Sequence, residues 1–113
     1  MDNQRVFSTP WFYIEALPSA SGEHPFYRIV EGDGVCAAVL TETGELVMVQ
    51  QNRPAFGQKT LEFPAGAVDI GETPLEAIRR ELYEETGYQC SSMALIGGGN
   101  IRPDRYKFWV WYC

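Results

Sequence analysis

The sequence has no uncharged apolar run near the roughly 18 residues that a membrane-spanning helix needs. It also lacks internal repeats and low-complexity tracts, and no apolar signal-peptide core follows its polar first residues. These absences argue against a transmembrane protein, a fibrous chain and a secreted precursor. We therefore predict a cytoplasmic protein that has no membrane partner.

Cysteine is scarce as well. The chain has only Cys36, Cys90 and Cys113, an odd number with no C-x-x-C spacing. This pattern does not fit a small secreted domain held together by disulfides. We expect all three cysteines to be free thiols in a reducing compartment.

Basic residues are fewer than acidic ones. Nine lysines and arginines face fifteen aspartates and glutamates, which gives a formal net charge of −6. Such a chain is a poor partner for a nucleic-acid backbone, so we predict no nucleic-acid binding. An acidic protein can still bind a polyphosphate when a metal ion mediates the contact.

The composition is that of one ordinary globular domain. The 113 residues are 45% hydrophobic, 13% aromatic and 21% charged, which excludes a disordered tail and leaves room for one core. The pattern predicts a β-rich α+β (or α/β/α) fold with a mixed sheet and a single helix. We expect residues 1–24 to form an irregular arm, in which 11–14 is either a short strand or an apolar docking segment. The predicted strands are 26–30, 35–40, 45–50, 60–63, 93–96 and 106–112, with a turn at 41–44 and a loop at 97–100.

The boundaries of the helix are clear in the sequence. Thr73 is a good N-cap, Pro74 suits the first helical position, and Glu76 completes a capping-box pattern. Gly87 is typical of the position just after a helix. The spacing predicts a helix over 74–86 that packs on the sheet through an apolar stripe of Leu75, Ile78 and Leu82.

Three carboxylates crowd the end of this helix. Glu81, Glu84 and Glu85 lie where the helix dipole already disfavours negative charge, and Glu81 and Glu85 also repel each other at i, i+4 spacing. A hard divalent cation would turn this repulsion into attraction, because Mg²⁺ prefers carboxylate oxygens. The alternative is a solvated acidic face paired with Arg79 and Arg80.

The loop before the helix favours the metal interpretation. Residues 64–72 contain one proline and two glycines, so main-chain groups can approach a ligand closely. Glu72 adds a fourth acidic side chain just before the helix. A tight connector with a dipole-stabilising Glu72 is the simpler alternative.

These residues together resemble the Nudix box, G-x5-E-x7-R-E-U-x-E-E-x-G-U. The match runs from Gly66 through Glu72 to Arg80, Glu81, Glu84, Glu85 and Gly87, over residues 66–88. Leu82 satisfies the first bulky aliphatic position, whereas Tyr88 stands where Ile, Leu or Val is usual. The resemblance implies a Nudix-like α/β/α fold.

The resemblance also implies roles for individual residues. Glu81 and Glu85 would be the principal metal ligands, Glu84 a ligand or base, and the Ala65 carbonyl a further ligand. Glu72 and Arg80 would hold the loop and the helix together. The implied reaction is hydrolysis of a nucleoside diphosphate linked to another moiety, with Mg²⁺ or Mn²⁺ as cofactor. A Nudix-fold binding or assembly protein without turnover is the alternative.

The substrate is indicated by weaker features. The segments 51–54 and 61–66 resemble the ADP-ribose and sugar-nucleotide pyrophosphatase branch, and Pro103 lies where that branch commonly has a proline. Tyr106 instead resembles a marker of dinucleoside polyphosphate hydrolases. Of these readings we favour the sugar-nucleotide branch. The residues predicted to meet the substrate are Arg53, Arg102, Pro103 and Arg105.

The sequence of the last predicted strand indicates that a layer covering one face of the sheet is missing. Family members usually continue after this point with a further strand and a second helix, so we expect either a C-terminally truncated domain without that helix or a partner subunit that supplies the cover. Residues 106–112 are apolar on both faces and would need a cover. We therefore predict a homodimer that buries Trp109 or Trp111 together with part of residues 7–14.

Overall fold

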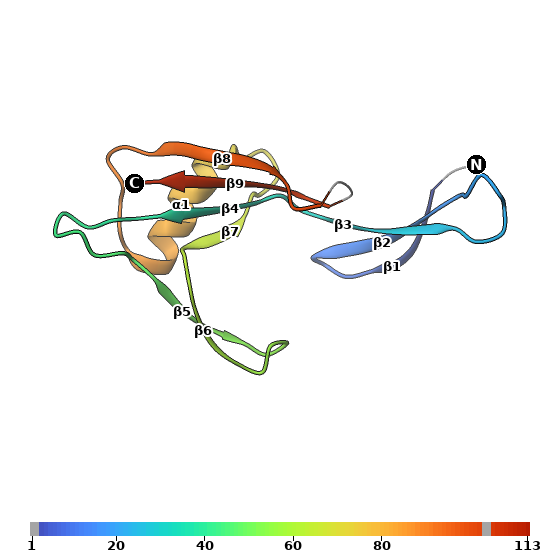
Figure 1. Ribbon diagram of the computed structural model, residues 1–113, viewed down its shortest axis with the longest axis horizontal. Coiled ribbons are helices and arrows are strands. Elements are labelled where there is room, and N and C mark those ends of the chain that lie inside the picture. The colour runs from blue at the N-terminus through green and yellow to red at the C-terminus, as the bar shows by residue number, and fades with distance from the viewer. Residues whose placement is uncertain (1–2, 103–104) are drawn as a thin grey trace.

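The computed structural model describes residues 3–102 and 105–113. Three strand groups and one helix form an elongated molecule with principal extents of 60 × 31 × 21 Å. Figure 1 shows an N-terminal sheet at one end, a four-stranded sheet with the helix at the other, and a hairpin standing off from the four-stranded sheet. The α+β class with a single described helix is as predicted.

The N-terminal sheet corrects our prediction of an irregular arm. Strands β1 (Gln4–Ser8), β2 (Phe12–Leu17) and β3 (Phe26–Glu31) pair antiparallel in the order β1-β2-β3. The prolines at 10, 18 and 25 all fall just outside these strands, where no ladder hydrogen bond is lost. The first turn is closed by Thr9, whose Oγ1 accepts hydrogen bonds from the amides of Trp11 and Phe12.

The main sheet has the order β7-β4-β9-β8. Its strands are β4 (Gly34–Ala38), β7 (Ala65–Ala67), β8 (Ala94–Asn100) and β9 (Lys107–Tyr112). Strands β4 and β9 run parallel, and the other two pairs are antiparallel. The prediction of a loop over 97–100 was wrong, because these residues pair with β9 as part of β8. A Cβ at Gly98 would lie 2.7 Å from Cδ1 of Trp109, so glycine there permits the close approach.

Helix α1 (Pro74–Thr86) covers one face of this sheet and has the predicted caps. The Oγ1 of Thr73 accepts from the amide of Glu76 at 3.1 Å, and Gly87 ends the helix at φ +76°. The core packs Ile78 and Leu82 of α1 against Val35 and other residues of β4, with Leu75 partly buried beside them. The apolar stripe predicted for this helix is therefore confirmed.

The tryptophans of β9, which we predict to lie in a dimer interface, point towards the helix. Trp109 pairs in register with Val35, and Trp111 with Ala37, so both side chains face the helix-covered side of the sheet. Both pack against the core of their own chain. Each is only partly buried there, so the burial of its remaining surface by a partner stays a prediction. Phe108, Val110 and Tyr112 alternate to the opposite face.

The predicted hairpin of 35–40 with 45–50 forms only in part. Its turn is present, since Gly44 adopts φ +82°. The strands pair at the bridge between Leu40 and Leu46, with hydrogen bonds from the Thr41 amide to the Glu45 carbonyl and from the Val47 amide to the Val39 carbonyl. Strand β5 (Val49–Arg53) instead pairs with β6 (Gln58–Glu62) as a separate two-stranded hairpin. The next strand, β7, leads directly into the loop before α1.

The expectation of three free thiols was wrong, because Cys90 and Cys113 form a disulfide. The sheet brings them together. The main chain of Cys113 exchanges hydrogen bonds with Ala38 and Leu40 of the β4 region, next to the segment that follows α1. Cys36 remains a thiol, and partial burial raises its pKa. In the part of the chain described, no helix is long and apolar enough to cross a membrane.

Candidate functional site

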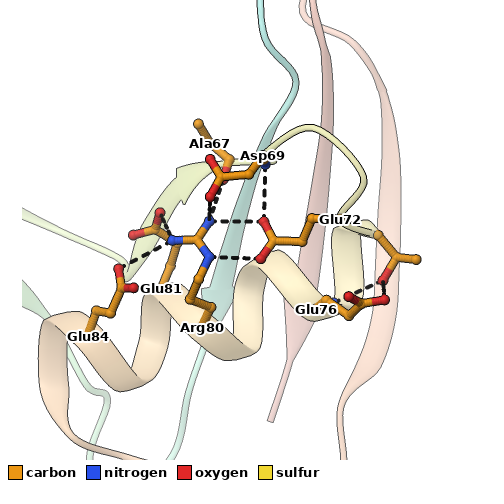
Figure 2. A network of polar contacts seen from close by, with 8 residues as sticks. Ala67, Asp69, Glu72, Glu76, Arg80, Glu81 and Glu84 are labelled. Atoms are coloured by element: carbon orange, nitrogen blue, oxygen red, sulfur yellow. Dashed lines mark hydrogen bonds and ion pairs between the residues drawn. The ribbon is translucent and has the colours of Figure 1, made fainter.

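Arg80 links the helix to the loop that precedes it. Its guanidinium donates to both carboxylate oxygens of Glu72, from Nε at 2.8 Å and from Nη2 at 3.0 Å. Nη2 also donates to the carbonyl of Ala67 at 3.0 Å, and the amide of Asp69 donates to Glu72 at 3.1 Å. Figure 2 shows this network around the Arg80 side chain. The loop is thus held against α1 by bidentate, charge-assisted hydrogen bonds.

The same guanidinium also contacts two of the clustered glutamates. Nη1 donates to Glu81 at 2.9 Å and to Glu84 at 3.2 Å, as Figure 2 shows. The hydrogen bond from Arg80 is the largest cause of the lowered pKa of Glu72. In return, hydrogen bonds to Glu72 and then to Glu81 raise the pKa of Arg80. Arg79 is not part of this network. Its Nη1 donates to the carbonyl of Cys90.

We expect the fork geometry of Arg80 to matter more than its charge. In Arg80→Lys a single ammonium replaces the planar fork and cannot bind both oxygens of Glu72 while reaching Ala67. Loss of such an outer contact should weaken Mn²⁺ binding by about tenfold or more. Titration of Mn²⁺ by electron paramagnetic resonance would measure this. Arg79→Lys is the matched control, and equal affinities in the two variants would contradict the expectation.

Glu81 and Glu85 both face strand β7. A Cβ built on Gly66 would lie 2.1 Å from Cδ of Glu81, so only glycine leaves room for that carboxylate. Glu85 accepts a hydrogen bond from the amide of Ala65, the neighbouring residue, at 3.0 Å. One turn apart on the helix, the two half-buried carboxylates therefore lie against adjacent residues of one strand.

Glu85 is held at both oxygens. Oε1 accepts from the Ala65 amide, and Oε2 accepts from Nε2 of Gln51 at 3.0 Å. Burial is the main cause of a raised pKa at Glu85, and the negative charge of Glu81 adds to it, while the Ala65 amide acts in the opposite direction. Gln51 was not among the predicted site residues. The sequence marks it only as part of the segment 51–54.

The donor set fits a hard divalent cation in its chemistry, because it offers carboxylate oxygens next to a glycine that leaves them room. The third predicted carboxylate, Glu84, is exposed and contacts Arg80. Within the described ranges no three acidic, histidine or cysteine side chains gather closely enough to hold an ion. A site built from Glu81, Glu84, Glu85 and the Ala65 carbonyl therefore stays a prediction.

The residues predicted to meet the substrate lie in different parts of the fold. Arg53 is on the β5–β6 hairpin, Arg102 is exposed just after β8, and Arg105 pairs with Glu31 of β3 at 2.9 Å. Pro103 lies outside the described residues. The hydrogen bond with Glu62 is the largest cause of the raised pKa of Arg53, and the charge of Glu85 makes a smaller contribution. We therefore consider Arg53 the one most closely associated with the helix carboxylates.

Arg53 is already paired. Its Nε and Nη2 donate to the two oxygens of Glu62 at 2.8 and 2.7 Å, and the hydroxyl of Thr60 donates to the same carboxylate. The hydrogen bond from Arg53 is the largest cause of the pKa of Glu62 being lowered to about 2. A phosphate that binds Arg53 must compete with Glu62.

This pair predicts a pH dependence of the hairpin. Because the folded-state pKa of Glu62 is depressed, its contribution is fully present above the unfolded value of about 4.3. It is lost as the pH falls towards the folded value of about 2. We expect the protection of the β5 and β6 amides against exchange, relative to their intrinsic rates, to fall over this range. Glu62→Gln should remove the dependence, and an unchanged pH profile in that variant would contradict the assignment.

A cavity lies between β3 and the β8–β9 connection. It has a volume of about 330 Å³, and its lining includes Arg28, Asp33, Asn100, Arg105 and Lys107. Asp33 also accepts a hydrogen bond at its carbonyl from the amide of Val68, in the loop held by Arg80. This cavity therefore lies next to the loop that follows β7.

The chain resembles several known proteins. It is 38% identical to a methanol dehydrogenase activator of Bacillus methanolicus over 71% of this chain and 44% of that protein. It is 34% identical to an ADP-ribose pyrophosphatase of Bacillus subtilis over 74% of this chain and 46% of the relative. An RNA pyrophosphohydrolase of Francisella tularensis subsp. mediasiatica is 39% identical over 56% of this chain and 41% of that protein. The chain thus spans less than half the length of these relatives.

A solved structure of an ADP compounds hydrolase superposes with a TM-score of 0.82. The superposition covers all of this chain and 64% of that one at 20% identity, which shows the shared fold. The family model of the NUDIX domain matches residues 30–112, from the end of β3 to the end of β9. This match includes the loop, the helix and the carboxylates described above, and the chain therefore belongs to the NUDIX domain family.

Proposed function

We propose that the chain is a divalent-metal-dependent pyrophosphohydrolase that acts on a nucleoside diphosphate linked to a second moiety. The observation that carries the proposal is the placement of Glu81 and Glu85 side by side against β7, next to the Arg80–Glu72 contact. This arrangement supports the ligand set that we predict from the sequence, with Mg²⁺ or Mn²⁺ as cofactor. Bound there, the cation would neutralise the pyrophosphate oxygens and activate a water molecule for in-line attack on phosphorus.

The chain's own residues would hold and orient this centre. In the proposal Glu81, Glu84, Glu85 and the Ala65 carbonyl provide the oxygen ligands. Arg80 and Glu72 fix the loop that carries Gly66. If Glu84 does not bind the cation, it is the better candidate for the base that accepts the water's proton, because it is exposed and one of its oxygens contacts Arg80, whereas both oxygens of Glu85 accept hydrogen bonds.

We propose ADP-ribose or another sugar nucleotide as the substrate. The segments 51–54 and 61–66 support this choice, as does the similarity to a protein named ADP-ribose pyrophosphatase. Arg53 would contact a phosphate after release from Glu62. The cavity beside Asp33 offers space and basic side chains, Arg105 among them, for another part of the substrate. Contacts of Arg102 and Pro103 with the substrate stay predictions from the sequence.

A substrate panel tests the proposal directly. The panel contains ADP-ribose, GDP-mannose, a diadenosine polyphosphate, 8-oxo-dGTP and 5′-triphosphorylated RNA, each with Mg²⁺, with Mn²⁺ and with chelator. We expect ADP-ribose to yield AMP and ribose 5-phosphate in a metal-dependent reaction. Preferred hydrolysis of the RNA or of the diadenosine polyphosphate would contradict the proposal that the substrate is a sugar nucleotide. Binding without turnover of any compound would instead support a binding or assembly protein.

We also propose that the active form is a cytoplasmic homodimer. The N-terminal sheet supports the dimer, because the exposed side chains of Phe7 (55%) and Tyr27 (61%) lie on one face of it, where the register pairs Phe7 with Ile14 and Ile14 with Ile29. Exposed apolar patches of this kind are typical of protein interfaces. A second copy that packs on β1–β3 would cover them. A stable monomer at micromolar concentration in multi-angle light scattering would contradict the proposal.

A further inference from the structure

The carboxylate of Glu85 receives hydrogen bonds from two separate parts of the chain. Ala65 donates from the start of β7, and Gln51 donates from the centre of β5, each at 3.0 Å. An ionised carboxylate offers about four lone-pair sites on its two oxygens. The two donors occupy one site on each oxygen, which fixes the plane of the carboxylate and leaves one site on each oxygen for another ligand.

Gln51 reaches Glu85 from a hairpin that otherwise pairs only with itself in the described sheets. Strands β5 and β6 form their own two-stranded sheet, which Figure 1 shows standing off from the main sheet. Gln51 is half-buried, whereas its neighbours Gln50 and Asn52 are exposed. The alternation of a strand therefore directs Gln51 towards α1 and its neighbours away from it.

The same face of β5 carries Arg53, two residues further along. The charge of Glu85 acts on Arg53, so the hydrogen bond from Gln51 holds the hairpin where this arginine and the helix carboxylates influence each other. The bond from Gln51 thus has two consequences. It orients Glu85, and it sets the position of a basic side chain beside the site.

We infer that Gln51 is a positioning residue for the metal site, which orients Glu85 for the cation and connects the hairpin that carries Arg53 to that site. This inference rests on the proposed function only in that Glu85 binds a cation. A hydrogen bond to a charged group contributes enough that its loss changes an equilibrium by about tenfold. A purely structural role for Gln51 would leave the affinity for the cation unchanged.

Direct Mn²⁺ binding to the full chain tests the inference without substrate. In Gln51→Met the side chain keeps its approximate length and loses the donor, and we expect about tenfold weaker Mn²⁺ binding by electron paramagnetic resonance. The matched control is Gln50→Met, an exposed neighbour of the same residue type, which should bind as the wild type does. In a Glu85→Gln background, Gln51→Met should cause no further loss.

A second measurement separates the connection from the affinity. In metal-free protein, Gln51→Met should accelerate amide exchange of β5 and β6 relative to Gln50→Met. Gln51→Asn, which keeps the amide but shortens the side chain, should behave like Gln51→Met. If circular dichroism shows that Gln51→Met does not fold, Gln51→Asn tests the inference in its place.

The outcomes distinguish this inference from the proposed function. Equal Mn²⁺ affinities of the Gln51 and Gln50 variants would overturn the inference, even if the wild type hydrolyses ADP-ribose. Absence of Mn²⁺ binding by the wild type would overturn it as well. If the variants differ as expected and no substrate is hydrolysed, the inference stands and the proposed reaction is wrong.

Discussion

Glu85→Gln should lower metal-dependent hydrolysis by about a hundredfold or more while the protein stays folded, because it removes a ligand of the cation. The substitution removes one of the two carboxylates that lie against β7 and keeps the size of the side chain. Steady-state kinetics with ADP-ribose at saturating Mg²⁺ would measure the loss of kcat. Glu76→Gln, in the first turn of the same helix, is the matched control and should retain activity.

We also expect a definite direction for the change in stability of the metal-free Glu85→Gln variant. Because burial raises the folded-state pKa of Glu85, its ionisation costs stability as the pH rises above the unfolded value of about 4.3. Glu85→Gln removes this cost and the repulsion from Glu81, so its free energy of unfolding at neutral pH should equal or exceed that of the wild type. Below the unfolded pKa the two proteins should converge. A fall of several kcal/mol at neutral pH would show that Glu85 is a structural partner.

Gly66→Ala should separate function from stability. The added Cβ would lie 2.1 Å from Cδ of Glu81, but this atom is near the end of a flexible side chain and can move away. We therefore expect a small change in unfolding free energy, about 1 kcal/mol or less. Displacing the carboxylate from β7 should lower kcat/KM by about a hundredfold, because misplacement of a ligand by about 1 Å is costly.

A second glycine provides the control for this experiment. A Cβ at Gly32 would meet no atom within 4 Å, and its φ is not in the left-handed region. Gly32→Ala should therefore retain both activity and Mn²⁺ affinity. Wild-type activity in Gly66→Ala would contradict the placement of Glu81 in the site. A loss in Gly32→Ala of the same size would show that the assay reports general damage.

Much of the candidate site could be predicted because its signals are local. The caps at Thr73 and Gly87 depend on hydrogen bonds within one turn, so they are visible in the order of the residues. The i, i+4 spacing of Glu81 and Glu85 likewise follows from the helix period alone. The pattern around these residues also identified the family correctly.

Other features depend on contacts between distant segments, which local propensity does not encode. Glycines at 97–99 disfavour a strand in isolation. Hydrogen bonds with β9 nevertheless hold these residues in a strand. Cys90 and Cys113 show no paired spacing in the sequence, and they meet because β9 ends beside the segment after α1. The order of the strands in the sheet therefore decided both the strand at 97–99 and the disulfide.

The sequence by itself determined the helix, its caps, its apolar stripe and the cluster of carboxylates, because each follows from the helical period and from hydrogen bonds between near neighbours. Only the tertiary structure decided which way the tryptophans of β9 face and which residues hold the glutamates. Gln51 lies 34 residues from Glu85, and Arg53 is paired with Glu62 across a hairpin. Such partners are chosen when sheets and helix pack, since an amide or a guanidinium binds whichever carboxylate the fold places within reach.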